Sequence, residues 1–387
     1  MSPSSTNDLI TVHGAPSWRI ANESVEAFLT RDGGHLGPVT FRTTHGDIQP
    51  FAVAPWWNET LGPDAPEMLR CLRGDFFCAP FGGNASPWRN ERHPPHGETA
   101  SARWRPLSLA EKTPGRVSLE AELKLTVRPG RVLKSIQLRP DETNVYCRHT
   151  LQDMSGPMCL GHHAMLQFPN EEGAGRIALS PFRHGQVCPQ PFEVAAQGGY
   201  SCLKTAATFK DLRKVPLATG GVADLTRYPS REGFEDLVMV SAARRPAIAW
   251  TTVAFPAQGY LWFGLKDPKV LASTVMWHSN GGRHYPPWNG RHRGVLGLEE
   301  ITSYFHFGLA ESAAENPISR RGIPTCLRLR RDRPLRIDYI IGVAPIPPDF
   351  DCVRTVRFIR DGIILEAVSG AAVEHRVDIG AISGTQQ

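Results

Sequence analysis

The chain has 387 residues and a formal net charge of +5, with 41% hydrophobic and 21% charged residues. This composition is typical of a globular protein. The arginines are spread along the sequence and form no basic run that could follow a phosphate backbone, which argues against nucleic acid as a partner. No window approaches the roughly 18 consecutive apolar residues of a membrane helix, so we expect no membrane partner either.

The N-terminus reads MSPSSTNDLI and lacks both the basic start and the apolar core of a secretion signal, so we expect a cytoplasmic protein. Residues 1–12 are rich in Ser, Thr, Asn and Pro, and we expect them to be disordered. The eight cysteines include no CxxC pair, which predicts buried free thiols. The sequence also lacks the glycine motif of a dinucleotide site and a P-loop, so we expect no cofactor.

Strand patterns begin clearly at residues 117–127, VSLEAELKLTV, where apolar and polar side chains alternate. Residues 132–138 and 144–153 flank a turn-forming segment and predict a hairpin. Further short apolar runs, each bounded by turn residues, lie at 176–179, 237–241, 247–254, 260–265 and 337–343. With 36 Gly, 33 Pro and no long helical period, the chain is predicted to be all-β, a large antiparallel β-sandwich. No strong linker interrupts it, so residues 13–387 are expected to form a single domain.

Three segments combine titratable side chains with glycine-bearing loops, at residues 72–104, 160–169 and 294–307. Each supplies groups that can take part in acid and base chemistry. The residues that stand out in them are Arg73, His96, His162, His163, Glu299 and Glu300.

The run WHSNGGRHYPPWNGRH, residues 277–292, is interrupted by glycine and proline and is predicted to be a structured loop. Its rings either fill a core beneath the loop or line a site. Read as metal ligands together with His306 and Glu299, the histidines of this run, His278, His284 and His292, match no recognised spacing, so we expect no metal site. The residues best suited to line a site here are Trp277, Arg283, Tyr285 and Trp288.

Taken in order, these segments resemble those of the galactose mutarotase-like superfamily, which contains the aldose 1-epimerases. Residues 25–41, VEAFLTRDGGHLGPVTF, also resemble the opening strand, glycine pair and return strand of that family. The resemblance extends from about residue 25 to about residue 345. It implies the family's large β-sandwich, often called a supersandwich, and a small carbohydrate as the substrate.

Residue by residue, Arg73 in LRGDFF matches the family's substrate-positioning arginine, and His96 in PPHGETASARW matches its first histidine. His163, just before AMLQFP, matches the second histidine, with His162 as the alternative. Glu299 in LGLEE matches the glutamate that acts as base. The match for the sugar-binding aspartate is open, and Asp267 in GLKDP is one candidate.

Adjacent residues of a strand point to opposite faces, so at most one of His162 and His163 faces a groove. The same holds for Glu299 and Glu300, and if Glu299 points inward we expect Glu300 to be solvated. Glu299 could then take the proton of a sugar's C1 hydroxyl while a protonated histidine gives one to the ring oxygen. This chemistry requires no metal, nucleotide or covalent intermediate.

The resemblance therefore predicts an aldose 1-epimerase-like enzyme that interconverts the anomers of a free sugar. In it, Trp277, Tyr285 and Trp288 would cover the apolar face of the sugar ring. Together with Arg73, the loop arginines could bind a carboxylate or phosphate if the sugar carries one: Arg283, Arg291 and Arg293. Two alternatives stay open: a non-catalytic carbohydrate-binding protein, and an epimerase or lyase that acts on an acidic sugar. The sequence does not decide the oligomeric state, and a homodimer is allowed.

Overall fold

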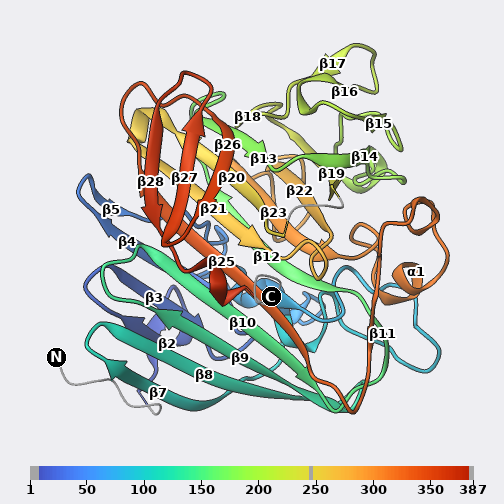
Figure 1. The fold of residues 1–387 in the computed structure, drawn as a ribbon. Coiled ribbons are helices and arrows are strands. Elements are labelled where there is room, and N and C mark those ends of the chain that lie inside the picture. The colour runs from blue at the N-terminus through green and yellow to red at the C-terminus, as the bar shows by residue number, and fades with distance from the viewer. Residues whose placement is uncertain (1–7, 244–246, 383–387) are drawn as a thin grey trace.

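The computed structural model describes residues 8–243 and 247–382, and antiparallel strands dominate it (Figure 1). The larger of its two main sheets has nine strands in the order β18 (Arg227–Tyr228), β13 (Gly175–Leu179), β20 (Ala249–Phe255), β21 (Tyr260–Lys266), β25 (Leu335–Pro345), β10 (Asn144–Gln152), β9 (Gly130–Leu138), β8 (Arg116–Leu125) and β7 (Arg105–Thr113). The other has seven strands in the order β15 (Thr208–Phe209), β14 (Phe182–Val187), β19 (Phe234–Ala242), β22 (Ser273–Asn280), β23 (Val295–Thr302), β12 (Leu160–Gln167) and β6 (Phe77–Cys78).

Smaller elements complete the fold. A five-stranded sheet contains β1 (Ile10–Val12), β2 (Ala15–Ala21), β3 (Val25–Thr30), β4 (Leu36–Thr43) and β5 (Gly46–Ile48), and a three-stranded sheet contains β26 (Val353–Ile359), β27 (Gly362–Ala367) and β28 (Ala372–Arg376). Two short pairs join β11 (Gly156–Met158) to β24 (Leu327–Leu329) and β16 (Val215–Pro216) to β17 (Val222–Ala223). The helices are α1 (Leu309–Ala313) and the 3-10 turns η1 (Glu67–Cys71), η2 (Glu98–Ala100), η3 (Ala195–Gln197), η4 (Leu212–Lys214), η5 (Pro256–Gln258), η6 (Ser319–Arg321) and η7 (Ile379–Ala381).

The main core lies between the nine-stranded and seven-stranded sheets. Leu119 and Ile136 of the first sheet belong to the same buried cluster as Ala164, Leu166 and Leu298 of the second. The predicted antiparallel β-sandwich is therefore confirmed. Its predicted hairpin is present as well, because β9 and β10 pair from Gln137 opposite Tyr146 to Arg131 opposite Gln152.

The seven-stranded sheet is also buried on its outer face, where loops cover it. Met165, Val275 and Ile301 of this sheet pack in a second cluster with Trp56 and Trp288, which come from loops. Every residue of β22 and β23 is consequently buried. Burial on both faces is consistent with the lack of a clear alternation of apolar and polar residues in these strands.

The three-stranded sheet packs on the outer face of the nine-stranded sheet, as Figure 1 shows for the red strands in front of the yellow ones. Val356 and Leu365 of this small sheet share a third buried cluster with Leu261, Phe263 and Ile340 of β21 and β25. The nine-stranded sheet is therefore covered on both sides in this region.

Two expectations from the sequence are corrected by the strand assignments. Residues 1–7 lie outside the described residues, but Ile10–Val12, expected to be disordered, form β1 and pair with β2. Trp277, expected in a loop, lies within β22, and the loop between β22 and β23 begins only after Asn280. The eight cysteines are free thiols, as predicted, and five of them are buried. Among the helices of the described residues, none has the length and apolar character required to cross a membrane.

Candidate active site

A cavity of about 180 Å³ opens on the outer face of the seven-stranded sheet. Its floor is formed by His163 of β12, Trp277 of β22 and Glu299 of β23, which are neighbouring strands of the sheet. Its walls come from the covering loops and include Pro66, Leu69, His96, Phe192, Arg283, Trp288 and His306. The cavity holds about six times the ~30 Å³ that one water occupies in the liquid.

Glu299 and His163 face each other on the cavity floor. They are register partners on β23 and β12, and Nε2 of His163 lies 3.4 Å from Oε1 of Glu299. Both side chains are almost fully buried, at 6% exposed for His163 and 3% for Glu299. Residues two positions apart on a strand lie on the same face of the sheet. His163 and Glu299 therefore point outward with Met165 and Ile301, which belong to the buried cluster on the outer face.

Burial sets the protonation of this pair. It raises the pKa of Glu299 well above its ordinary value, although the charge of Arg283 acts in the opposite direction. Burial, assisted by the nearby His96, lowers the pKa of His163 well below its ordinary value. Both shifts disfavour the charged forms, which favours a pair that holds one proton over a pair that holds two or none. One proton shared by two groups provides one acid and one base.

His163 is fixed by its neighbour Phe76. The backbone N–H of His163 donates to the carbonyl of Phe76 at 2.9 Å, and the two rings stack with centroids 4.5 Å apart. The ring of His96 approaches His163 edge-on at 5.1 Å, and burial lowers the pKa of His96 to about 3. Three of the side chains singled out from the sequence therefore meet at one end of the cavity: His96, His163 and Glu299.

His96 occupies a backbone position with φ of 59°, in the left-handed region that non-glycine residues rarely adopt. Its N–H donates to the carbonyl of Gly82 at 2.7 Å, and its Nδ1 lies 3.3 Å from Sγ of Cys78. A non-glycine residue keeps this left-handed backbone conformation only where surrounding contacts hold it in place.

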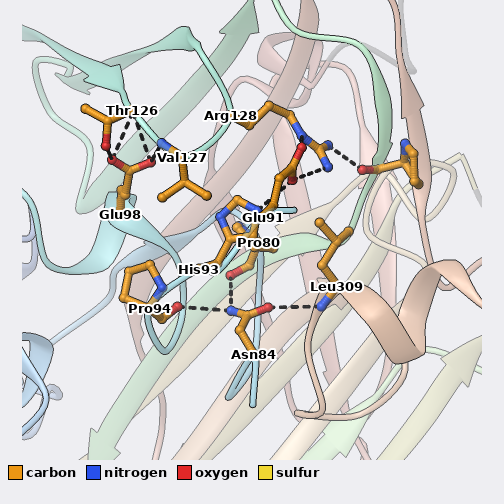
Figure 2. Close-up of polar contacts among 11 residues, drawn as sticks. Pro80, Asn84, Glu91, His93, Pro94, Glu98, Thr126, Val127, Arg128 and Leu309 are labelled. Atoms are coloured by element: carbon orange, nitrogen blue, oxygen red, sulfur yellow. Dashed lines mark hydrogen bonds and ion pairs between the residues drawn. The ribbon is translucent and has the colours of Figure 1, made fainter. Parts of the chain in front are cut away.

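The loop around His96 is tied down at three points (Figure 2). Asn84 donates through Nδ2 to the carbonyls of Pro80, Gly82 and Pro94, and its Oδ1 accepts from the N–H of Leu309. Before His96, Glu91 accepts from Arg128 at 2.6 Å and binds His93 at 2.9 Å. After it, Glu98 accepts from the hydroxyl of Thr126 at 2.6 Å and from two backbone N–H groups, those of Thr126 and Val127.

The same loop also holds His306, which lines the cavity and was considered in the sequence only as a metal ligand. The N–H of Gly83 donates to the carbonyl of His306 at 2.6 Å, while burial lowers the pKa of its ring to about 4. Its position in SYFHF, directly after the strand that carries Glu299, was the only signal in the sequence.

Arg283 forms part of the cavity wall. Its Nε donates to Oε1 of Glu193 at 2.6 Å, and its guanidinium carbon lies 4.5 Å from the ring centre of Trp288 and 5.3 Å from that of Trp277. The hydroxyl of Tyr285 also binds Glu193, at 3.2 Å. The positive charge of Arg283 is thus balanced by a buried carboxylate of the protein itself.

A second buried carboxylate, Glu235 of β19, lies behind Trp277. It accepts from the indole Nε1 of Trp277 at 2.9 Å and from the hydroxyl of Ser279 at 2.8 Å. Burial raises the pKa of Glu235 to about 7, although Arg283 acts against the shift. We did not single out Glu235 from the sequence, since GFEDLVMV reads as an ordinary strand.

Four residues that the sequence predicted as substrate-binding do not line this cavity. Arg73 is fully buried, and its guanidinium donates to the backbone carbonyls of Cys71, Val12 and His13. His162 points into the core between the sheets, where Nδ1 lies 2.7 Å from Oδ2 of Asp75. Asp267 accepts from the N–H of Lys269 in a turn. Tyr285 lies on an adjoining groove.

Glu300 is not solvated, contrary to expectation. Its side chain is 1% exposed and forms an ion pair with Lys266 in the interior. The hydroxyls of Thr251 and Thr274 donate to its two oxygens at 2.6 and 2.7 Å. Glu300 faces the core between the two sheets, and loops cover the outer face that carries Glu299, so neither carboxylate reaches solvent.

In the part of the chain that the structure describes, no three or more His, Cys, Asp or Glu side chains are grouped so that they could hold a metal ion.

No protein-family model and no curated protein matches the chain. Solved structures do match it. The Slr1438 protein from Synechocystis sp. PCC 6803 is 12% identical, with 88% of this chain and 99% of that chain covered and a TM-score of 0.58. A putative aldose 1-epimerase from Klebsiella pneumoniae is 13% identical, with 85% and 79% covered and a TM-score of 0.56. A galactose mutarotase-like protein from Clostridium acetobutylicum is 11% identical, with 88% and 98% covered and a TM-score of 0.54.

These matches define the fold. The chain has the fold of galactose mutarotase-like proteins, as the resemblance in its sequence implied.

Proposed function

We propose that the protein is an aldose 1-epimerase-like enzyme, which interconverts the anomers of a free sugar. The observation that carries the proposal is the 3.4 Å separation of His163 Nε2 and Glu299 Oε1 on the floor of a buried cavity. Two groups that share one proton can act on the two oxygens bonded to C1 of a sugar. The shared fold with putative aldose 1-epimerases supports the same substrate class.

In the proposed reaction, the proton that burial favours on Glu299 first passes to His163. Glu299, now a carboxylate, removes the proton of the C1 hydroxyl while His163 protonates the ring oxygen. The bond between C1 and the ring oxygen breaks, and the C1 carbonyl forms. After rotation about the C1–C2 bond, the ring oxygen attacks the other face of C1, and each proton returns to its original owner. The pair ends with the proton count with which it began. Each positioned proton-transfer group typically contributes about a hundredfold to ten-thousandfold.

The surrounding side chains have supporting roles in this proposal. His96, neutral because of its burial, can donate to or accept from a sugar hydroxyl beside His163. Arg283 supplies N–H donors that cannot lose their proton. Trp277 and Trp288 present apolar surface on which the C–H face of a sugar ring can pack.

The test is anomer exchange measured by saturation-transfer NMR across a panel of neutral aldoses, uronates and sugar phosphates. Wild-type protein should accelerate exchange of at least one sugar. Glu299→Gln, which keeps the shape but cannot take a proton, should lower the rate by about a hundredfold or more while binding persists. Glu366→Gln, on an exposed carboxylate of the three-stranded sheet, is the matched control and should leave the rate unchanged.

The proposal is overturned if wild-type protein leaves every sugar at its uncatalysed rate. Saturable binding without exchange would instead indicate a carbohydrate-binding protein, and new ultraviolet absorbance from a uronate would indicate a lyase.

A further inference from the structure

A second depression adjoins the cavity. It has a volume of about 530 Å³ and shares three residues with the cavity: Pro66, Leu69 and Trp288. The segment around residues 59–66 forms one side of it, and Tyr285 and Asn289 lie on the other. We call this depression the outer groove. It is about three times as large as the cavity and lies where the cavity meets the covering loops.

The arrangement of cavity and groove fixes which way a substrate would point. Glu299 and His163 rise from central strands of the sheet, so C1 and the ring oxygen of a sugar have to reach the floor. Of the three shared residues, Pro66 directly precedes η1, Leu69 lies in η1, and Trp288 lies in the loop after β22. Because all three belong to the covering segments and not to the sheet, they form the rim of the cavity. The side of the ring remote from C1 then faces the rim. A substituent on that side would extend into the outer groove.

The lining of the outer groove suits an uncharged polyhydroxylated ligand. Trp288 and Tyr285 offer ring surface, while Asp64 and Asn289 offer polar groups to which hydroxyls can bind. The nearby cation Arg291 is already matched, because its two Nη atoms donate to the two oxygens of Glu59 at 2.5 and 3.1 Å. Since Arg283 is likewise matched by Glu193 at 2.6 Å, neither arginine calls for an anionic substrate.

From this continuity of cavity and groove we infer that the outer groove binds the second sugar unit of a reducing disaccharide or longer oligosaccharide, whose reducing unit occupies the cavity. The inference rests on the proposed anomer exchange. It names the substrate class as neutral reducing oligosaccharides, in which the glycosidic substituent leaves C1 of the terminal unit free to react.

The experiment compares matched substrates, glucose against maltose and cellobiose, and xylose against xylobiose, by saturation-transfer NMR. For at least one pair, kcat/KM should be higher for the disaccharide by about tenfold, the change expected for about 1.4 kcal/mol of added contact. The groove-filling variant is Gly62→Trp. A Cβ added at Gly62 meets no atom within 4 Å, and the backbone there is not in the left-handed region, so a side chain can begin at this position without a clash at Cβ or backbone strain.

Gly62→Trp should lower kcat/KM for the preferred disaccharide by about tenfold and change that for the monosaccharide by less than about twofold. Thr113→Trp is the control, because Thr113 is exposed on β7 at the edge of the other large sheet. It should alter neither value. Equal rates for all monosaccharide and disaccharide pairs, or equal losses for both substrates in Gly62→Trp, overturn the inference while the proposed function stands.

Calorimetric titration with maltose, cellobiose and xylobiose separates the two proposals if no sugar is turned over. Disaccharide binding that is weakened by Gly62→Trp and not by Thr113→Trp supports the groove although anomer exchange has failed. Binding that is unaffected by Gly62→Trp, or no binding of any disaccharide, overturns the groove as well.

Discussion

Nε2 of His163 lies 3.4 Å from Oε1 of Glu299 because the two residues are register partners on adjacent antiparallel strands. The floor of the cavity is therefore held in place by the hydrogen-bonded strands of the sheet. The residues around it come from loops that are joined to one another by hydrogen bonds. Asn84, for example, links the segment before His96 to the segment after His306. A site on such a framework keeps its geometry before any ligand binds.

The pH dependence of anomer exchange should reflect the shared proton. Acid removes the active form by protonating His163, whose pKa is lowered by burial, so the acid limb of kcat/KM should lie below pH 6.5. Alkali removes it by ionising Glu299, whose pKa is raised by burial, so the alkaline limb should lie well above pH 4.5. Between them we expect a broad plateau in rates measured by saturation transfer. An acid limb centred near 6.5 would show that the imidazole is solvated, contrary to this arrangement.

The free energy of unfolding should fall steeply as the pH drops below about 6.5. Eight of the described histidines are buried with a lowered pKa: His35, His96, His149, His163, His278, His292, His306 and His375. Their unfolded forms bind protons first on acidification, so each costs about 1.4 kcal/mol of stability per pH unit below about 6.5, until its folded pKa is reached. Glu235 and Glu299 have raised pKa values and therefore add stability as the pH falls, but these two carboxyl groups are outnumbered by the eight histidines.

Urea denaturation at about pH 7.5, 6.5 and 5.5 measures this dependence. His149→Leu, which removes a ring whose two nitrogens have no hydrogen-bond partner among the described residues, should reduce the slope by about one proton. A free energy that is constant from pH 7.5 to 5.5 contradicts the prediction.

Glu300→Gln should destabilise the protein without acting on the chemistry. It leaves Lys266, which is 3% exposed, without its charge partner in the interior, at a cost of about 3–5 kcal/mol. The matched surface variant Glu366→Gln, which breaks surface pairs with Arg354 and Arg357, should cost far less stability. Denaturation midpoints compare the two, and a similar small loss for both variants would be incompatible with a buried ion pair.

Arg73→Met should lower stability and leave KM unchanged in the protein that remains folded. Its guanidinium holds the carbonyls of Val12 and His13 at 2.7 and 2.9 Å, so about 3 kcal/mol or more should be lost with these charge-assisted bonds. Arg283→Met, in the cavity wall, should instead raise KM. The roles assigned to the two arginines are reversed if Arg73→Met raises KM and Arg283→Met does not.

Much of the fold could be predicted from local patterns. Alternation at residues 117–127 and the turn between 138 and 144 predicted strands and a hairpin that the structure contains as β8, β9 and β10. The density of Gly and Pro, with the absence of a helical period, predicted an all-β fold. The loop after β22 was predicted to begin at Trp277, four residues too early, because a strand buried on both faces has no alternation to mark its end.

The sequence predicted which types of residue form the candidate site, but it identified only some of the individual residues. His96, His163, Trp277, Arg283, Trp288 and Glu299 all line one cavity, although more than 200 residues separate the first from the last. Glu235 and His306 were missed as parts of the site, since only the pairing of β19 with β22 and the turn at Gly83 bring them to it.

What the sequence by itself determined is the all-β class, several of the strands and turns, and the kind of chemistry available. The family resemblance favoured His163 and Glu299 over their neighbours, but the packing that turns these two side chains towards the cavity belongs to the tertiary structure. His162 and Glu300 point into the core and find Asp75 and Lys266, and Arg73 is buried against backbone carbonyls. The physical reason is that a buried charge or ring nitrogen needs a partner, and here the partners lie far away in sequence. Strand register and loop packing bring them together, and neither leaves a mark in the local pattern of residues.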